Sequence, residues 1–278
     1  QKAVELHIER EQLAVVSQRL RLMQPEDFDA ALACHRRVAA RNHGMVEKFD
    51  EEIRGARGDI QVRRLGWYDG GVLRGYAAYR FESASDSNYT QNRLSVEELV
   101  YEDGAILRGL LGGLNMQADL AQTVILRTGE EDFHHLLDDP QDVSKNYIDY
   151  GFLQTNVSAV GTMFKLVDGE DFVRRTAYRP FPAGTLTAAF RYRDELAGGE
   201  RCLRIAFSGG RWAVADADAA ADVTVTCRQG DLASLLMGSC QLEGMLRLGA
   251  ASADNGEAAQ QLSRLLHYAQ KPFLNSDY

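Results

Sequence analysis

The sequence predicts an α+β protein built from two domains. Its 278 residues exceed the roughly 100–150 residues of one average domain. In each half of the chain, alternating apolar and polar residues typical of strands give way to apolar residues at helical spacing. The pattern changes character past Tyr147–Phe152. We therefore expect an N-terminal strand and connector at 1–18, a first domain at 19–157 and a second domain at 158–278.

The N-terminal segment, residues 4–9 (VELHIE), alternates apolar and polar side chains, as a strand with one buried face does. No partner strand lies nearby in the sequence. The strand therefore either belongs to a domain upstream or folds back onto a later sheet. The chain also begins at Gln1 rather than at a methionine, which favours a trimmed N-terminus.

After a short strand at 20–23, the first domain is predicted to contain a helix, three antiparallel strands, a second helix, a fourth strand and a short helix. The first helix opens at Pro25, because proline fits the first turn and the acids after it complement the helix dipole. His35 lies on the apolar stripe of this helix, where a packed core histidine is the more common role than a catalytic base. Asp69-Gly70-Gly71 predicts a hairpin with a bulge or a longer loop. Strands are expected at 20–23, 62–68, 72–82, 93–101 and 123–127, and further helices at 106–114 and 130–137.

This order of elements resembles a GNAT-type acetyltransferase domain. In such a domain the loop after the central strand carries the motif R/Q-x-x-G-x-G/A, which holds the pyrophosphate of acetyl-CoA at a helix N-terminus. The corresponding turn here is Tyr101-Glu102-Asp103-Gly104-Ala105, with one glycine and no basic residue before it. Two carboxylates stand where a phosphate would lie, and like charges repel by roughly 4 kcal/mol per pair at 4 Å. The resemblance therefore implies a degenerate GNAT-like domain with no cofactor-binding residues.

Three glycines in the following helix, Gly109, Gly112 and Gly113, offer a second possible phosphate loop. They lie mid-helix on an apolar stripe. We therefore interpret them as positions of close helix packing.

The second domain is predicted as a sheet followed by helices, an α+β layer arrangement. Strands are expected at 163–168, 184–193, 201–207, 211–215 and 222–227, and helices at 170–178, 232–237, 242–248 and 258–269, with Asp231 as a helix cap. The D-V-T-V-T strand and the amphipathic last helix resemble a sterol carrier protein-like domain. Tyr192, Trp212 and Met237 either line an apolar tunnel or pack in the core. The small strand residues favour at most a short cavity.

The two domains in this order resemble the enhanced intracellular survival (Eis) family of acetyltransferases. Family members carry an active GNAT domain first, an inactive one second and the carrier-like domain last. The resemblance implies that this chain is the C-terminal part of such an enzyme, inactive alone, and that residues 4–9 close the sheet of the missing first domain. It implies acetyl-CoA as cosubstrate of the full-length protein, with none bound by this chain. The implied acceptor is an amine such as an aminoglycoside or a polyamine.

The tail from Pro272 to Tyr278 ends on an aromatic residue. In the family, the carboxylate of a terminal aromatic residue is the base that deprotonates the amine. The resemblance therefore implies that Tyr278 is catalytic through its C-terminal carboxylate and that Asp277 binds the substrate. Family members end in phenylalanine, and tyrosine leaves the carboxylate unchanged. The alternative is an inert tail.

Charge and cysteine usage limit the partners. Lysine and arginine total 31 against 40 acidic residues, a net charge of −9, which argues against nucleic acid or an anionic membrane and suits a small cationic molecule. The four cysteines are scattered without metal-ligand spacing, which predicts reduced packing residues of a cytoplasmic protein and no metal site. We expect a homo-oligomer. The alternative function is a non-enzymatic binding or scaffold protein that uses the carrier-like domain for a ligand or for assembly.

Overall fold

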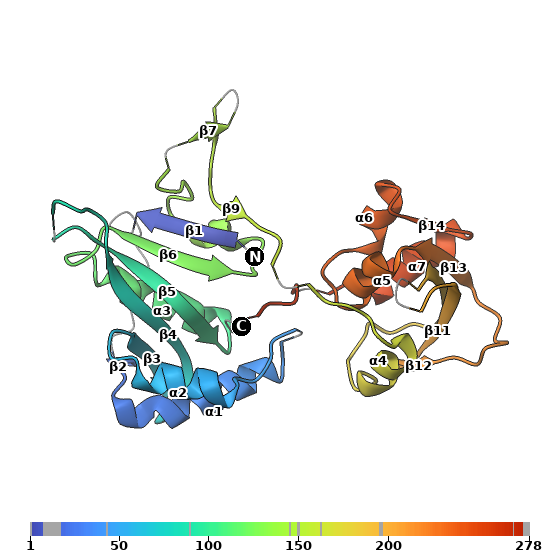
Figure 1. Ribbon diagram of the computed structural model, residues 1–278, viewed down its shortest axis with the longest axis horizontal. Helices are drawn as coiled ribbons and strands as arrows, with labels where there is room; N and C mark the ends of the chain where they lie inside the picture. Colours follow the sequence, from blue (N-terminus) through green and yellow to red (C-terminus); the bar gives the residue numbers. More distant parts are fainter. Residues whose placement is uncertain are drawn as a thin grey trace. The chain divides into compact units, whose positions relative to one another are not determined.

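The computed structural model describes residues 2–7, 18–42, 44–88, 90–144, 146–148, 151–161, 163–194, 197–268 and 270–274. The chain forms two compact units, each of mixed α and β structure (Figure 1). The first unit comprises Gln1–Gly161 with Phe273–Tyr278, and the second comprises Thr162–Pro272. The predicted α+β class is confirmed for both units.

The first unit is built on a sheet with the strand order β2-β3-β4-β5-β6-β1-β9. β5 and β6 run parallel and the other neighbours run antiparallel. The register pairs Arg93–Ser95 of β5 with Thr123–Ile125 of β6, so these two strands pair near their starts. The strands are β1 (Lys2–His7), β2 (Leu20–Leu22), β3 (Arg63–Asp69), β4 (Val72–Ser83), β5 (Asn92–Tyr101), β6 (Thr123–Thr128) and β9 (Val157–Ser158), beside a small ribbon of β7 (Tyr147–Ile148) and β8 (Phe152–Leu153).

The N-terminal strand is part of this sheet. β1 pairs antiparallel with β6 along its length, starting with Lys2 opposite Thr128. The interpretation of residues 4–9 as the closing strand of a separate domain is corrected by this pairing, and the alternative, a return to a later sheet, is the arrangement found. The physical reason is that β6 offers β1 a complete row of backbone partners beside β5, while Val4 enters the core at 3% exposure.

Helices cover both faces of this sheet. Side chains alternate along β4, so Ala77 and Tyr79 pack with α3 (Gly104–Asn115), whereas Tyr76 and Ala78 pack with α1 (Phe28–Ala39). This separation follows from the period of two along a strand. A second helix, α2 (Asp50–Gly58), was not predicted, because its nine residues carry one large apolar side chain. Two 3₁₀ turns, η2 (Pro25–Asp27) and η3 (Phe133–Leu136), complete the unit.

The glycines of α3 allow the helix to approach the sheet closely. A Cβ atom at Gly109 would lie 2.0 Å from the ring of Trp67, and one at Gly113 would lie 2.5 Å from Leu65. The predicted packing role is confirmed for Gly109 and Gly113. The hairpin between β3 and β4 turns through Gly70 and Gly71, both at positive φ. The pairing register of the two strands shifts between Trp67 and Tyr68.

The second unit has the strand order β12-β11-β10-β13-β14. Its core joins Phe190, Ile205 and Val225 of the sheet to Leu232 and Leu262 of the helices. The strands are β10 (Leu186–Arg193), β11 (Glu200–Ser208), β12 (Arg211–Val214), β13 (Val223–Cys227) and β14 (Ala251–Ala253). The helices are α4 (Gly169–Arg175), α5 (Gln229–Leu236), α6 (Leu242–Arg247) and α7 (Gly256–Leu265).

Two expectations for this unit were wrong. Residues 163–168 form no strand, and Asp168 instead caps α4 by accepting the N–H of Asp171 at 2.9 Å. Asp231 lies in the first turn of α5 rather than at its cap. The helix begins earlier because the buried Gln229 amide donates to the carbonyl of Leu166 at 3.0 Å.

Candidate functional site

The turn between β5 and α3 is the place where a GNAT-type domain is expected to hold a pyrophosphate. In this chain Asp103 is the N-cap of α3, and its Oδ1 accepts the N–H groups of Ala105 and Ile106 at 2.9 Å each. These N–H groups form the positive end of the helix and are the donors that a phosphate would use. The helix N-terminus is therefore occupied by a carboxylate of the chain itself.

The neighbouring carboxylate, Glu102, is directed at arginines. Its Oε1 accepts Nε of Arg37 at 2.8 Å and its Oε2 accepts Nη1 of Arg74 at 3.1 Å, with Arg41 at 3.7 Å. Burial raises the pKa of Glu102, but the hydrogen bonds and charges of Arg37 and Arg74 outweigh burial and hold that pKa below its usual value. The sequence did not reveal these partners, since Arg37 and Arg74 are 65 and 28 positions away from Glu102.

The backbone at Gly129, directly after β6, forms a platform on which the C-terminal tail packs. A Cβ atom at Gly129 would lie 2.9 Å from Cδ2 of Phe273, and Leu274 is 7% exposed. Phe273 therefore groups with the first unit, whereas the predicted boundary placed 158–278 in one domain. The predicted site residues Asp277 and Tyr278 lie outside the described residues, so their roles stay predictions.

A charged cluster lies where α1 meets the sheet. Lys48 Nζ contacts Glu52 Oε1 at 2.6 Å and Glu98 Oε1 at 3.1 Å, and His35 Nε2 is 3.7 Å from the same Glu98 oxygen. Burial, aided by the charge of Lys48, lowers the pKa of His35 to about 4. The imidazole is neutral at pH 7, and its 1% exposure confirms the packed core histidine.

The cavity beside this cluster has a volume of about 210 Å³ and contains both signs of charge. Of its other carboxylates, Asp59 pairs with Arg80 at 3.2 Å, and Glu97 also bonds Arg80. The charged side chains of the cluster and of the cavity wall therefore pair with one another within the first unit.

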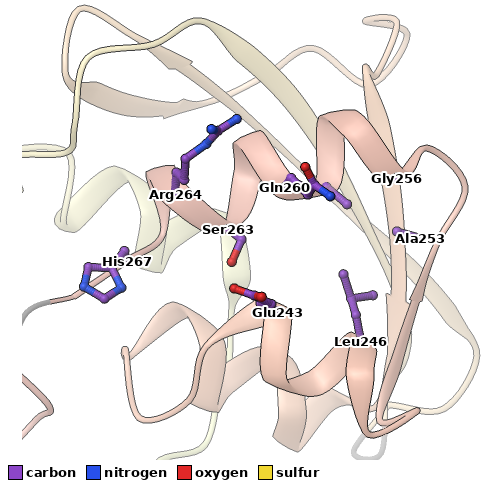
Figure 2. A pocket seen from close by; sticks show the side chains of 9 residues that line it. Glu243, Leu246, Ala253, Gly256, Gln260, Ser263, Arg264 and His267 are labelled. Atoms are coloured by element: carbon purple, nitrogen blue, oxygen red, sulfur yellow. The ribbon is translucent and has the colours of Figure 1, made fainter.

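The second unit contains a pocket of about 590 Å³ between α6, β14 and α7 (Figure 2). Figure 2 shows the Glu243 carboxylate and the Ser263 hydroxyl pointing toward one another across the gap, with His267 at one end. Apolar walls come from Leu246 and Ala253. A pocket of this size and mixed lining suits a small amphipathic molecule.

The three residues considered as tunnel lining do not line this pocket. Trp212 is 2% exposed and its ring centroid lies 4.6 Å from that of Phe181, within the core. Its indole Nε1 donates to the carbonyl of Thr176 at 3.0 Å. Trp212 therefore packs in the core, which is the second of the two predicted roles.

Among the described residues, no group of three or more His, Cys, Asp or Glu side chains is placed to hold a metal ion. None of their helices has the length and apolarity that crossing a membrane requires. All four cysteines are free thiols.

Comparison with known sequences identifies both units. Residues 39–155 match the family of the acetyltransferase (GNAT) domain, and residues 170–275 match the sterol carrier protein domain. The chain therefore contains a GNAT-like domain and a sterol carrier protein-like domain. No curated protein matches the sequence.

The whole chain aligns with solved structures of the same fold. Eis1 from Mycobacterium abscessus matches with a TM-score of 0.72 and 18% identity, over 100% of this chain and 67% of that chain. A GCN5-related N-acetyltransferase from Anabaena variabilis matches with a TM-score of 0.74 and 12% identity, over 100% of this chain and 67% of that chain. A probable N-acyltransferase from Enterococcus faecalis matches with a TM-score of 0.72 and 13% identity, over 100% of this chain and 66% of that chain. This chain thus spans about two thirds of the length of these structures, and at such identities the likeness is one of fold.

Proposed function

We propose that this chain is the C-terminal portion of an Eis-like, acetyl-CoA-dependent N-acetyltransferase whose acceptors are cationic amines such as aminoglycosides or polyamines. The observation that carries the proposal is the joint fold match, in which one alignment covers the GNAT domain and the sterol carrier protein domain together. The net charge of −9 supports a cationic acceptor, because an acidic protein attracts cations over long range.

The capped N-terminus of α3 supports a scaffolding role for the GNAT domain of this chain. Asp103 already holds the N–H groups of Ala105 and Ile106 that a pyrophosphate would need. A pyrophosphate arriving there would meet a carboxylate in place of free donors. The chain alone is therefore proposed to be inactive, with acetyl-CoA bound by a further domain of the full-length enzyme.

In the proposed reaction the amine nitrogen attacks the acetyl carbonyl carbon, the C–S bond breaks, and coenzyme A leaves as a thiolate that takes a proton from an acid outside this chain. The C-terminal carboxylate of Tyr278 accepts the proton that the amine loses. An α-carboxyl group has an unperturbed pKa of roughly 3.5 and needs desolvation to become an effective base. Asp277 holds the ammonium groups of the acceptor.

Two measurements test this proposal. Calorimetric titration of acetyl-CoA should show no binding tighter than about 1 mM for this chain and micromolar binding for the product of the complete reading frame. In that product, deleting Tyr278 or appending one glycine should reduce kcat by about 10²-fold, the usual scale for a general base. Tyr278→Phe is the control, because it keeps the carboxylate, and it should keep the turnover. Full activity of the extended enzyme would disprove the role of the carboxylate.

A second candidate function is favoured by the pocket between α6 and α7. Its apolar walls and polar end suit an amphipathic ligand, as expected for a non-enzymatic binding protein. Native mass spectrometry of the purified chain would show a co-purified small molecule in that case. We also propose that the protein is a cytoplasmic homo-oligomer, which cell fractionation and light scattering would test.

A further inference from the structure

We infer that Gly129 and Phe273 form a docking site that anchors the C-terminal tail on the GNAT domain and thereby positions the end of the chain. The contact is unusually close. A Cβ atom at Gly129 would lie 2.9 Å from Cδ2, 3.0 Å from Cβ and 3.2 Å from Cγ of Phe273. Glycine is required here because any side chain would displace the aromatic ring.

The platform under the ring is held by its neighbours. The N–H of Glu130 donates to Thr128 Oγ1 at 3.0 Å, and Glu130 Oε1 accepts the hydroxyl of Tyr101 at 2.9 Å. Thr128 is also the last residue of β6 and pairs with Lys2 of β1. The backbone on both sides of Gly129 is therefore fixed to the sheet, and a ring that packs on it has a defined place.

The tail residue that follows is buried. Leu274 is 7% exposed, and it groups with Phe273 in the first unit. Tyr278 lies four positions after Leu274, and four residues span at most about 13–14 Å. Docking of the tail would therefore keep the proposed base within that distance of Leu274.

The effect on turnover rests on the proposed function, whereas the docking itself does not. Positioning matters for a general base, since a displacement of about 1 Å can cost up to about 10²-fold in rate. Gly129 and Phe273 act through Tyr278 and are positioning residues. Loss of docking should therefore lower kcat and leave the KM for acetyl-CoA unchanged.

The experiment compares Gly129→Val and Phe273→Asp with two controls. Gly55→Ala is the matched glycine control, because a Cβ atom at Gly55 would have no atom of the described residues within 4 Å outside its own helix turn. Phe273→Leu is the conservative control that keeps an apolar side chain on the platform. The Phe273→Asp variant lies in the tail, so it tests docking even where Gly129→Val disturbs folding.

The first measurement is carboxypeptidase digestion followed by mass spectrometry. We expect digestion to slow at Leu274 in the wild type and in both controls, and to pass Leu274 at least about tenfold faster in the two docking variants. Equal rates in all proteins would overturn the docking site.

The second measurement is turnover of the full-length enzyme with the same variants. We expect kcat to fall at least about tenfold in the docking variants, with rescue in Phe273→Leu. Faster digestion with unchanged kcat would overturn the positioning role. If deletion of Tyr278 leaves kcat intact while the digestion difference persists, the proposed catalytic role fails and the docking site stands.

Discussion

In the first unit a buried lysine is surrounded by carboxylates, whereas in the second unit a buried arginine is surrounded by aromatic rings. Lys48 lies within 3.1 Å of Glu52 and Glu98, beside the neutral imidazole of His35. Burial raises the pKa of Glu98, because it removes water from around the carboxylate. The first unit therefore stabilises its buried cation with groups that titrate.

The second unit stabilises its buried cation with groups that do not titrate near neutral pH. Arg179 is 7% exposed, and its guanidinium carbon lies 4.6 Å from the ring centroid of Tyr268 and 5.2 Å from that of Trp212. Its Nη1 donates to the carbonyl of Leu236 at 3.1 Å, while its Nη2 has no hydrogen-bond partner among the described residues. The two units should therefore respond differently to pH and to the loss of a ring.

Removing the central ring of the second unit is expected to have the largest effect. Trp212→Ala deletes a fully buried side chain and one wall around Arg179, and should lower the free energy of unfolding of this unit by about 3–5 kcal/mol. Chemical denaturation followed by circular dichroism measures the loss. Trp212→Phe is the control, since it retains a ring and loses the bond to Thr176. A loss under about 1 kcal/mol for the alanine variant would contradict the role of this ring in the core.

Lowering the pH is expected to destabilise the first unit through His35. Its pKa is about 4 in the folded state against 6.5 for the free side chain, so the unfolded state binds more protons between these values. Stability should fall as the pH drops from 6.5 toward 4, by up to about 3 kcal/mol. The raised pKa of Glu98 acts in the opposite direction and makes this figure an upper bound.

The measurement for His35 is the free energy of unfolding as a function of pH. His35→Gln keeps a donor of similar size without the titration, and its stability should change less between pH 6.5 and 4. Identical pH profiles of the two proteins would exclude His35 as the source. The arginine cage of the second unit should show no such slope, because arginine stays charged throughout this range.

Changing the buried cation itself is expected to have a moderate effect. Arg179→Lys should cost about 1–2 kcal/mol, because an ammonium group is more strongly hydrated and stacks poorly on the rings of Tyr268 and Trp212. Arg179→Met should change stability by less than about 1 kcal/mol, since it removes a buried charge that has no carboxylate partner in the cage. Thermal unfolding of both variants measures the difference. A larger loss for methionine than for lysine would show that the charge, rather than the shape, is needed.

Sequence patterns predicted those features that depend on local spacing. The alternation along β4 and the glycines on the inner face of α3 follow from the periods of a strand and a helix. The partners of Glu102 and the Gly129–Phe273 contact join residues far apart in the chain, and no local pattern encodes them. The position of β1 was ambiguous for the same reason, because a strand pattern does not specify its neighbour.

The missed details share a second cause, which is competition between local signals and tertiary contacts. Asp231 has the side chain of a cap, but the buried bond from Gln229 to Leu166 starts α5 earlier. Residues 163–168 have strand composition, yet Asp168 is used to begin α4. In both places the structure satisfies a buried or terminal polar group first.

The smallest effect is expected at the N-termini of the helices, where both units use the same device. Asp103 caps α3 in the first unit with two N–H bonds at 2.9 Å, and Asp168 caps α4 in the second unit with one bond at 2.9 Å. Replacing Asp103 with alanine should cost about 1 kcal/mol and replacing it with asparagine much less, because asparagine still accepts these bonds. Asp168→Ala serves as the matched control on the other unit.

The same variants separate a structural cap from an occupied phosphate site. Asp103→Ala frees the N–H groups of Ala105 and Ile106, and it leaves Glu102 bound to Arg37 and Arg74. If Asp103 is what prevents anion binding at α3, pyrophosphate should raise the melting temperature of Asp103→Ala and leave both the wild type and Asp168→Ala unchanged. An equal response of Asp103→Ala and the wild type would mean that the turn as a whole, with the Glu102 carboxylate beside it, excludes the phosphate. In that case anion binding at this turn would require more than one substitution, and the two caps would differ only in their contribution to stability.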